Sequence, residues 1–92
     1  MPHTTVTVAS TSGLHARPAS LFVEAAQRYE AVVTIGVGDG PGVDAKSILF
    51  VMSLGAGHGT EVRIAAEGTD AEDAVIELSR LVATDLDIQL QD

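Results

Sequence analysis

Apolar residues change their spacing between residues 60 and 82, and this change constrains the fold more than any other feature of the sequence. In TEVRIAAEG (60–68) they alternate, with Val62, Ile64 and Ala66 on one side, as in a half-buried strand. They then recur every three or four positions, as on a helix that lies against a core. This second group is Ala71, Ala74, Val75, Leu78 and Val82. Between the two patterns, TDAE predicts a capping box in which Thr69 caps the helix and Glu72 reaches back.

The first third of the chain shows the same two patterns. Residues 4–9, TTVTVA, alternate like a strand, and residues 18–29 carry an apolar helical stripe. Residues 31–37, AVVTIGV, are rich in β-branched residues and predict a second strand. The turn sequence GDGPG follows at 38–42, and residues 43–45 offer a short return strand, so a hairpin is expected.

A short apolar helix is predicted within KSILFVMSLG (46–55), with Ser47 near its N-cap and Gly55 past its end. Residues 87–92 are expected to be loose. The complete order is β-α-β-β-α-β-α. Because one hairpin is explicit and no series of parallel crossovers is present, we predict an open-faced α/β sandwich. Its four-stranded, mostly antiparallel sheet has three helices on one face, in a single domain spanning residues 1–92.

Charge and composition exclude several classes of function. Thirteen acidic residues against five basic ones give a formal net charge of −8, which argues against a nucleic-acid partner. The chain has no cysteine, and its sequence contains no signal peptide or membrane span, so we expect a cytoplasmic protein without disulfides. His3 and His58 lack metal-ligand spacing, and GVGDGPG lacks the GK[ST] ending of a phosphate-binding loop. No metal and no cofactor is expected.

The segment GLHARPAS (13–20) is the strongest candidate for a functional site. Gly13 permits a sharp turn after the first strand, so that Leu14 points inward and His15 outward. Pro18 favours a helix start within a residue or two. His15 is therefore expected at the positive end of the first helix.

An anion is favoured at such a position, because the first amides of a helix have no intrahelical acceptor and the helix dipole adds positive charge. An imidazole is largely neutral near pH 7 and is a competent nucleophile. A phosphoryl group on His15 would lie beside the amides of Ala16 and Arg17, and the Arg17 guanidinium can fork onto phosphate oxygens. The alternative is that His15 only ends a turn and that Arg17 is a solvated charge.

Together, GLHARPAS and AKSILFVMSLGA (45–56) resemble the histidine-containing phosphocarrier proteins (HPr) of the bacterial phosphoenolpyruvate-dependent sugar phosphotransferase system. The resemblance covers the whole chain. It implies a phosphocarrier that is not itself an enzyme: enzyme I phosphorylates His15 at Nδ1, and His15 passes the group to enzyme IIA units of sugar permeases. Arg17 would be the phosphate partner. This family often has asparagine where this chain has Ser12, so Ser12 is given no catalytic role.

Ser47 resembles a regulatory serine that a kinase/phosphorylase modifies in some family members, although a stabilising N-cap would also explain a serine there. A helix this short cannot bury all of its apolar residues. Val51 and Leu54 are the expected core pair. Ile48, Leu49 and Met52 would then form a partner-facing patch for enzyme I and enzyme IIA. Phe50 either enlarges this patch or covers the core edge.

Two other interpretations stay open from the sequence. One is a specialised relative that carries phosphoryl groups into regulation, which differs in the acceptor that it phosphorylates. The other is a ligand-sensing α/β module in which His15 is incidental. Nothing in the sequence requires more than a monomer, and no membrane association is expected.

Overall fold

The chain folds in the order that the sequence predicts. The computed structural model describes residues 2–11 and 13–84, so the expectation that residues 87–92 are loose lies outside the described residues. The elements are β1 (His3–Thr7), α1 (Ala16–Gln27), β2 (Val32–Val37), β3 (Val43–Asp44), α2 (Ile48–Ser53), β4 (Glu61–Glu67) and α3 (Ala71–Val82). The predicted hairpin is present, because β2 and β3 pair antiparallel across the glycine-rich turn.

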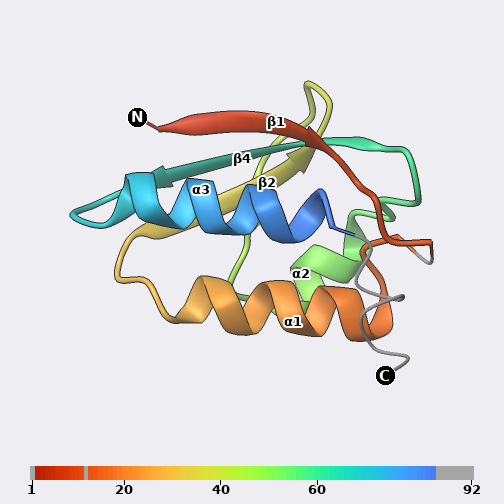
Figure 1. Cartoon of the computed structure of the whole chain (residues 1–92), viewed down its shortest axis with the longest axis horizontal. Helices are drawn as coiled ribbons and strands as arrows, with labels where there is room; N and C mark the ends of the chain where they lie inside the picture. Colours follow the sequence, from red (N-terminus) through yellow and green to blue (C-terminus); the bar gives the residue numbers. More distant parts are fainter. Residues whose placement is uncertain (1, 12, 85–92) are drawn as a thin grey trace.

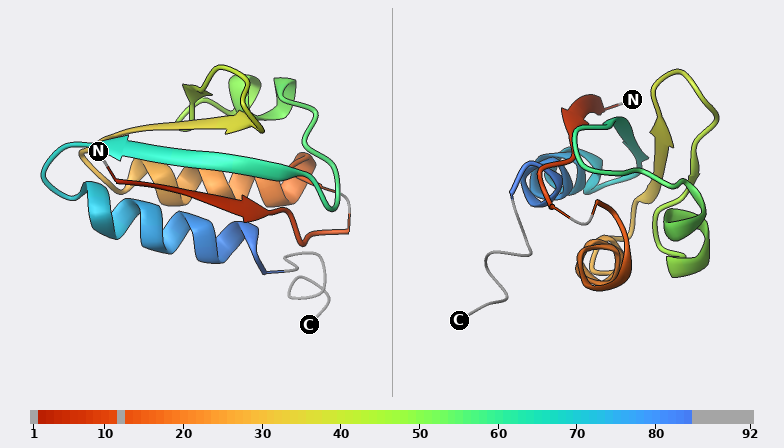
Figure 2. Two further views of the ribbon diagram at one scale, coloured as in Figure 1. Left: turned by 90° about the horizontal axis from the view of Figure 1, so that it is seen from above. Right: turned by 90° about the vertical axis from the view of Figure 1, so that its right-hand side faces the viewer.

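The four strands form one sheet in the order β1-β4-β2-β3. Every described pair is antiparallel, and inward-facing residues stand opposite each other, as in Val6 with Val62 and Ile35 with Ile64. The helices α1 and α3 lie side by side along one face of the sheet, and α2 packs beside α1 near the β3 edge (Figures 1 and 2). The predicted α/β sandwich with one open sheet face is therefore confirmed.

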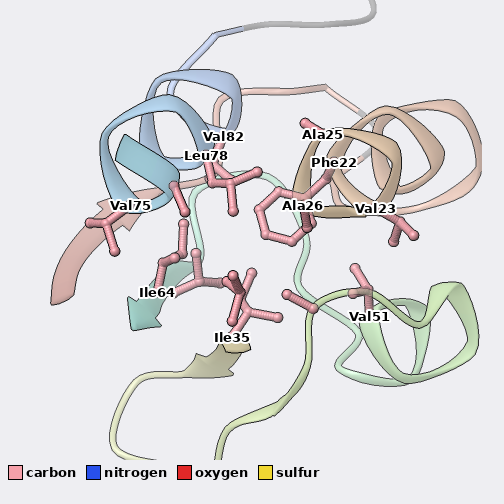
Figure 3. Packing of buried hydrophobic residues seen from close by; sticks show 14 of the residues in the cluster. Phe22, Val23, Ala25, Ala26, Ile35, Val51, Ile64, Val75, Leu78 and Val82 are labelled. Atoms are coloured by element: carbon pink, nitrogen blue, oxygen red, sulfur yellow. The ribbon is translucent and has the colours of Figure 1, made fainter. Parts of the chain in front are cut away.

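The core fills the space between the sheet and the helices. Phe22 of α1 and Leu78 of α3 point toward Ile35 and Ile64 of the central strands, and Val51 closes the layer from α2 (Figure 3). Each of these five side chains is completely buried. Burial of one such side chain stabilises the fold by roughly 1.5–3 kcal/mol. The apolar stripes of α1 and α3 therefore hold these helices against the sheet.

The helix boundaries differ from the predicted ones in detail. The first helix starts at Ala16, within two residues of Pro18 as predicted, but it ends at Gln27, before the predicted end at residue 29. The predicted capping box of α3 is wrong, because Asp70 occupies the N-cap position and makes no side-chain cap bond. Its carboxylate instead accepts from the backbone amides of Glu30 and Ala31, at 2.9 and 2.8 Å. These bonds, with the Glu30 amide as the largest cause, lower the pKa of Asp70.

A group of polar contacts anchors the C-terminal end of α1. The Tyr29 hydroxyl donates to Glu77 Oε1 on α3, and this bond is the main reason why the pKa of Tyr29 is raised to about 12. Arg28 forms an ion pair with Glu77 at 3.9 Å. Lys46 Nζ donates to the Tyr29 carbonyl oxygen at 2.7 Å, which ties the segment before α2 to the same point. These contacts join α1 to α3 and to the segment before α2 at the end of α1 that is remote from His15.

Candidate functional site

His15 stands at the N-cap position of α1, at the end of the molecule where the loop after α2 and the end of α3 also lie (Figure 1). Its backbone is extended, with φ −142° and ψ 151°, and its side chain makes no cap bond. The imidazole is exposed, whereas the neighbouring Leu14 side chain is buried. The predicted orientation, Leu14 inward and His15 outward, is confirmed, and the ring is left available for chemistry.

Ala16, the first residue of α1, has a left-handed backbone with φ +51°. It is the only non-glycine among the described residues with a positive φ. A side chain with a Cβ in this region costs about 1–2 kcal/mol, and such strain persists only where the surrounding structure imposes it, most often at functional sites. The backbone beside His15 is therefore held in a conformation that it would not adopt by itself.

Two loops pack together directly before the start of α1. The site loop comprises residues 8–15, of which all but Ser12 are described, and the backing loop comprises residues 55–60. Leu14 N donates to Ala56 O at 2.7 Å, and Gly59 N donates to Val8 O at 2.9 Å. Gly13 has φ +76°, and a Cβ there would lie 2.6 Å from Ala56 O. Glycine is therefore required before His15 for two reasons, its backbone angle and the close approach of the backing loop.

Ser10 and His58 are contacts at this site that sequence reasoning missed. The His58 Nδ1 atom lies 3.3 Å from Ser10 O, and the buried Ser10 hydroxyl donates to Thr84 O at 3.5 Å. Ala9 N also donates to Val82 O at 3.0 Å, so the site loop is fixed to the end of α3. The only signal in the sequence is a histidine in the glycine-rich stretch GAGHGT. His58 is exposed, but it has a specific partner.

The electrostatics at His15 favour an added negative charge. The first turn of α1 contains no acidic residue, so the partial positive charge of its amides is not neutralised from within the helix. Arg17 is exposed, two residues after His15. The ion pair between Arg28 and Glu77 is the only one among the described residues, which leaves the Arg17 guanidinium available. No group of three or more potential metal ligands occurs in the described part of the chain.

Comparison with known proteins shows the family to which the chain belongs. The family model described as "PTS HPr component phosphorylation site" matches residues 2–84. The phosphocarrier protein HPr of Haloferax volcanii is 49% identical over 81 residues, which cover 87% of this chain and 91% of the relative. The chain belongs to the HPr family. It is a phosphocarrier of the phosphotransferase system and not itself a catalyst.

Solved HPr structures share this fold. The HPr of Bacillus anthracis superimposes with a TM-score of 0.84 at 44% identity, covering 88% of this chain and 95% of that one. A dimer of HPr from Thermoanaerobacter tengcongensis gives a TM-score of 0.69 at 36% identity over the whole of both chains. Ser12, where this sequence departs from the asparagine often found in HPr proteins, lies outside the described residues.

The apolar surface predicted for this HPr-family chain lies on α2. Leu49 is 78% exposed, Phe50 53% and Ile48 37%, whereas Met52 is half-buried and packs against the core. Phe50 therefore enlarges the exposed surface, and Met52 contributes less to it than predicted. Val51 is completely buried, as expected. Leu54, its predicted core partner, is partly buried against the core.

Ser47 occupies the N-cap position of α2, where its hydroxyl accepts from Phe50 N at 3.5 Å. This confirms the N-cap prediction. The residue before it is bonded to the C-terminal part of α1, because Gln27 Nε2 donates to Lys46 O at 3.1 Å. The other end of α2 leads to the backing loop beside His15. Ser47 and His15 are therefore at opposite ends of the α2 surface.

No helix of residues 2–11 and 13–84 has both the length and the apolar character needed to cross a membrane.

Proposed function

We propose that His15 carries the phosphoryl group in a relay from enzyme I to the enzyme IIA units of sugar permeases. The observation that carries this proposal is an exposed imidazole at the start of a helix whose first turn contains no acid. In the charging step, the Nδ1 lone pair forms a P–N bond while the bond between phosphorus and the phosphorylated enzyme I breaks. In the second step the P–N bond breaks as the acceptor on enzyme IIA attacks.

The chain's own residues stabilise the phosphate only moderately. The helix N-terminus contributes about 0.3–1 kcal/mol at an exposed position and up to ~2 kcal/mol when partly buried. The amides of Ala16 and Arg17 can donate to phosphate oxygens, and the Arg17 guanidinium adds a charge-assisted contact. Moderate stabilisation suits a carrier, because a group that is held too tightly would not be passed on.

The test is incubation with phosphoenolpyruvate and enzyme I, followed by intact mass at neutral and acid pH. We expect one added phosphate that acid removes, and none on the His15→Ala variant. Arg17→Glu should impair transfer strongly and leave the unfolding midpoint nearly unchanged, because this side chain lies outside the core. A wild-type chain that stays unmodified would refute the proposal, and an Arg17→Glu variant with normal transfer would remove Arg17 from it.

We further propose that Ile48, Leu49 and Met52, extended by Phe50, form the surface on which both partner proteins dock. The helix that carries them, Ile48–Ser53, contains no charged residue, so apolar burial should provide most of the affinity. Leu49→Asp should therefore raise the KM of enzyme I for this chain at least tenfold. Ile76→Asp is a matched control, because Ile76 is 50% exposed on α3. Equal effects of the two substitutions would argue against the docking surface.

Phosphorylation of Ser47 by a kinase/phosphorylase is proposed as regulation of this docking. A phosphate would be tolerated at the N-cap of α2, yet it would place negative charge beside the apolar surface. Ser47→Asp, which keeps an N-capping side chain, should raise the KM for enzyme I, whereas Ser47→Ala should lower stability slightly and leave KM unchanged. Equal KM values for the two variants would contradict this regulatory role.

We also propose that residues 1–92 form a single domain that acts as a cytoplasmic monomer. Sedimentation equilibrium at micromolar concentration tests the oligomeric state, and a dimer mass would overturn it.

A further inference from the structure

One side chain of the backing loop, that of His58, contacts the backbone of the site loop. His58 Nδ1 lies 3.3 Å from Ser10 O, in the loop between α2 and β4 at the end of the molecule where α1 begins (Figure 1). A backbone carbonyl oxygen only accepts hydrogen bonds. The proton of this bond is therefore on Nδ1, and His58 is the donor.

The same carbonyl oxygen also accepts from Gly13 N at 2.9 Å. A carbonyl oxygen has two lone pairs, so it can accept from Gly13 N and from His58 Nδ1 at the same time. Gly13 stands two residues before His15, and its Cβ position is closed by the backbone at Ala56 and Gly57. The position of Ser10 O therefore fixes the turn at Gly13, and this turn directly precedes His15.

We propose that His58 is a positioning residue for phosphoryl transfer at His15, acting by donation from its Nδ1 to Ser10 O. This inference rests on the proposed function. Backbone bonds at Val8 and Leu14 join the two loops on either side of Ser10, and the His58 side chain joins them at Ser10 itself. Without this bond the loop keeps its outer attachments, but the Gly13 turn loses one of its supports. The His15 ring then samples more orientations and less often the one that is in line with the donor phosphorus.

A replacement for His58 should preserve the bond to Ser10 O if it places a donor nitrogen where Nδ1 lies. In asparagine the side-chain amide nitrogen is attached to Cγ, as Nδ1 is in histidine, so His58→Asn can donate from nearly the same place. His58→Ala removes the donor. His3→Ala is the matched control, because His3 is an exposed histidine at the start of β1, at the opposite end of the molecule (Figure 1).

Two measurements test the proposal on these three variants and the wild type. The first is the steady-state rate at which enzyme I phosphorylates the chain, analysed as kcat and KM. We expect His58→Ala to lower kcat by about 2- to 10-fold, the range that the loss of one neutral hydrogen bond gives, with KM within twofold of wild type. We expect His58→Asn to restore most of kcat and His3→Ala to change nothing.

The second measurement is hydrogen exchange of the Gly13 amide by NMR, which needs no partner protein. His58→Ala should exchange this amide faster than the wild type, and His58→Asn should protect it again. An unchanged kcat for His58→Ala overturns the proposal. So does a loss that appears in KM alone, or a loss in kcat that asparagine does not restore. These outcomes differ from failure of the proposed function, in which wild-type chain itself would gain no phosphate.

Discussion

Replacement of Gly13 by alanine should be unusually costly for a change that adds one methyl group. Two separate terms contribute. At φ +76° an alanine costs about 1–2 kcal/mol from backbone strain alone. The new Cβ would also lie 2.6 Å from Ala56 O and 2.7 Å from Gly57 Cα, both backbone atoms that cannot rotate away. The backing loop must shift, and the 2.7 Å bond from Leu14 N to Ala56 O is lost or lengthened.

A net hydrogen bond contributes about 1 kcal/mol, so Gly13→Ala should lower the free energy of unfolding by about 2–3 kcal/mol. In a domain of this size that corresponds to a decrease in Tm of roughly 10–20 °C. Gly55→Ala separates the two terms, because Gly55 has φ +64° and nothing within 4 Å of its Cβ position. Its cost should be the strain alone, about 1–2 kcal/mol.

Urea unfolding followed by circular dichroism measures both variants against the wild type. The expected order of stability is wild type, then Gly55→Ala, then Gly13→Ala. The Gly13 variant should also be phosphorylated more slowly by enzyme I, because a shift of the backing loop would displace the turn that directly precedes His15. Equal stability losses in the two variants would refute the argument that the backing loop presses on Gly13.

Three further predictions follow from contacts away from His15. Tyr29 is the only tyrosine and the chain has no tryptophan, so its absorbance titration should show a midpoint near 12, falling toward 10 in Glu77→Gln; a wild-type midpoint near 10 contradicts the hydrogen bond. The pKa of Asp70 is lowered from 3.8, so its stabilisation is complete above that pH and is lost as the pH falls through the lower folded value. The Tm difference between wild type and Asp70→Asn should therefore be full at pH 6 and shrink in acid; a constant difference refutes the linkage. Phe22→Ala, at a completely buried position, should cost about 3–5 kcal/mol in urea unfolding, and a cost below 1 kcal/mol would contradict the packing.

Local patterns in the sequence were enough to predict the element order and the exposed His15. Period-two alternation placed Val62 and Ile64 in the sheet, and Gly13 and Pro18 marked the turn and the helix start on either side of His15. These signals work because each depends on the backbone within a few residues. The layered fold then followed, because the apolar faces of the two long helices and of the sheet must be buried against each other.

Contacts between distant residues were not predictable in the same way. The sequence predicts Thr69 as the N-cap of α3, but Asp70 takes that position, and its carboxylate accepts from amides 39 and 40 residues away. His58 and Ser10 are separated by 48 residues, and neither lies in a recognisable pattern with the other. The left-handed backbone of Ala16 was not predictable either, because alanine rarely adopts a positive φ.

The most direct test of the phosphoryl relay is the state of the His15 imidazole. With ¹⁵N-labelled histidine, NMR of the chain before and after charging by enzyme I and phosphoenolpyruvate reports which ring nitrogen gains phosphorus. We expect Nδ1 of His15 alone to be phosphorylated, and we expect the unmodified signal to return when enzyme IIA is added. Phosphorus on His3 or His58, or no change at His15, would contradict it.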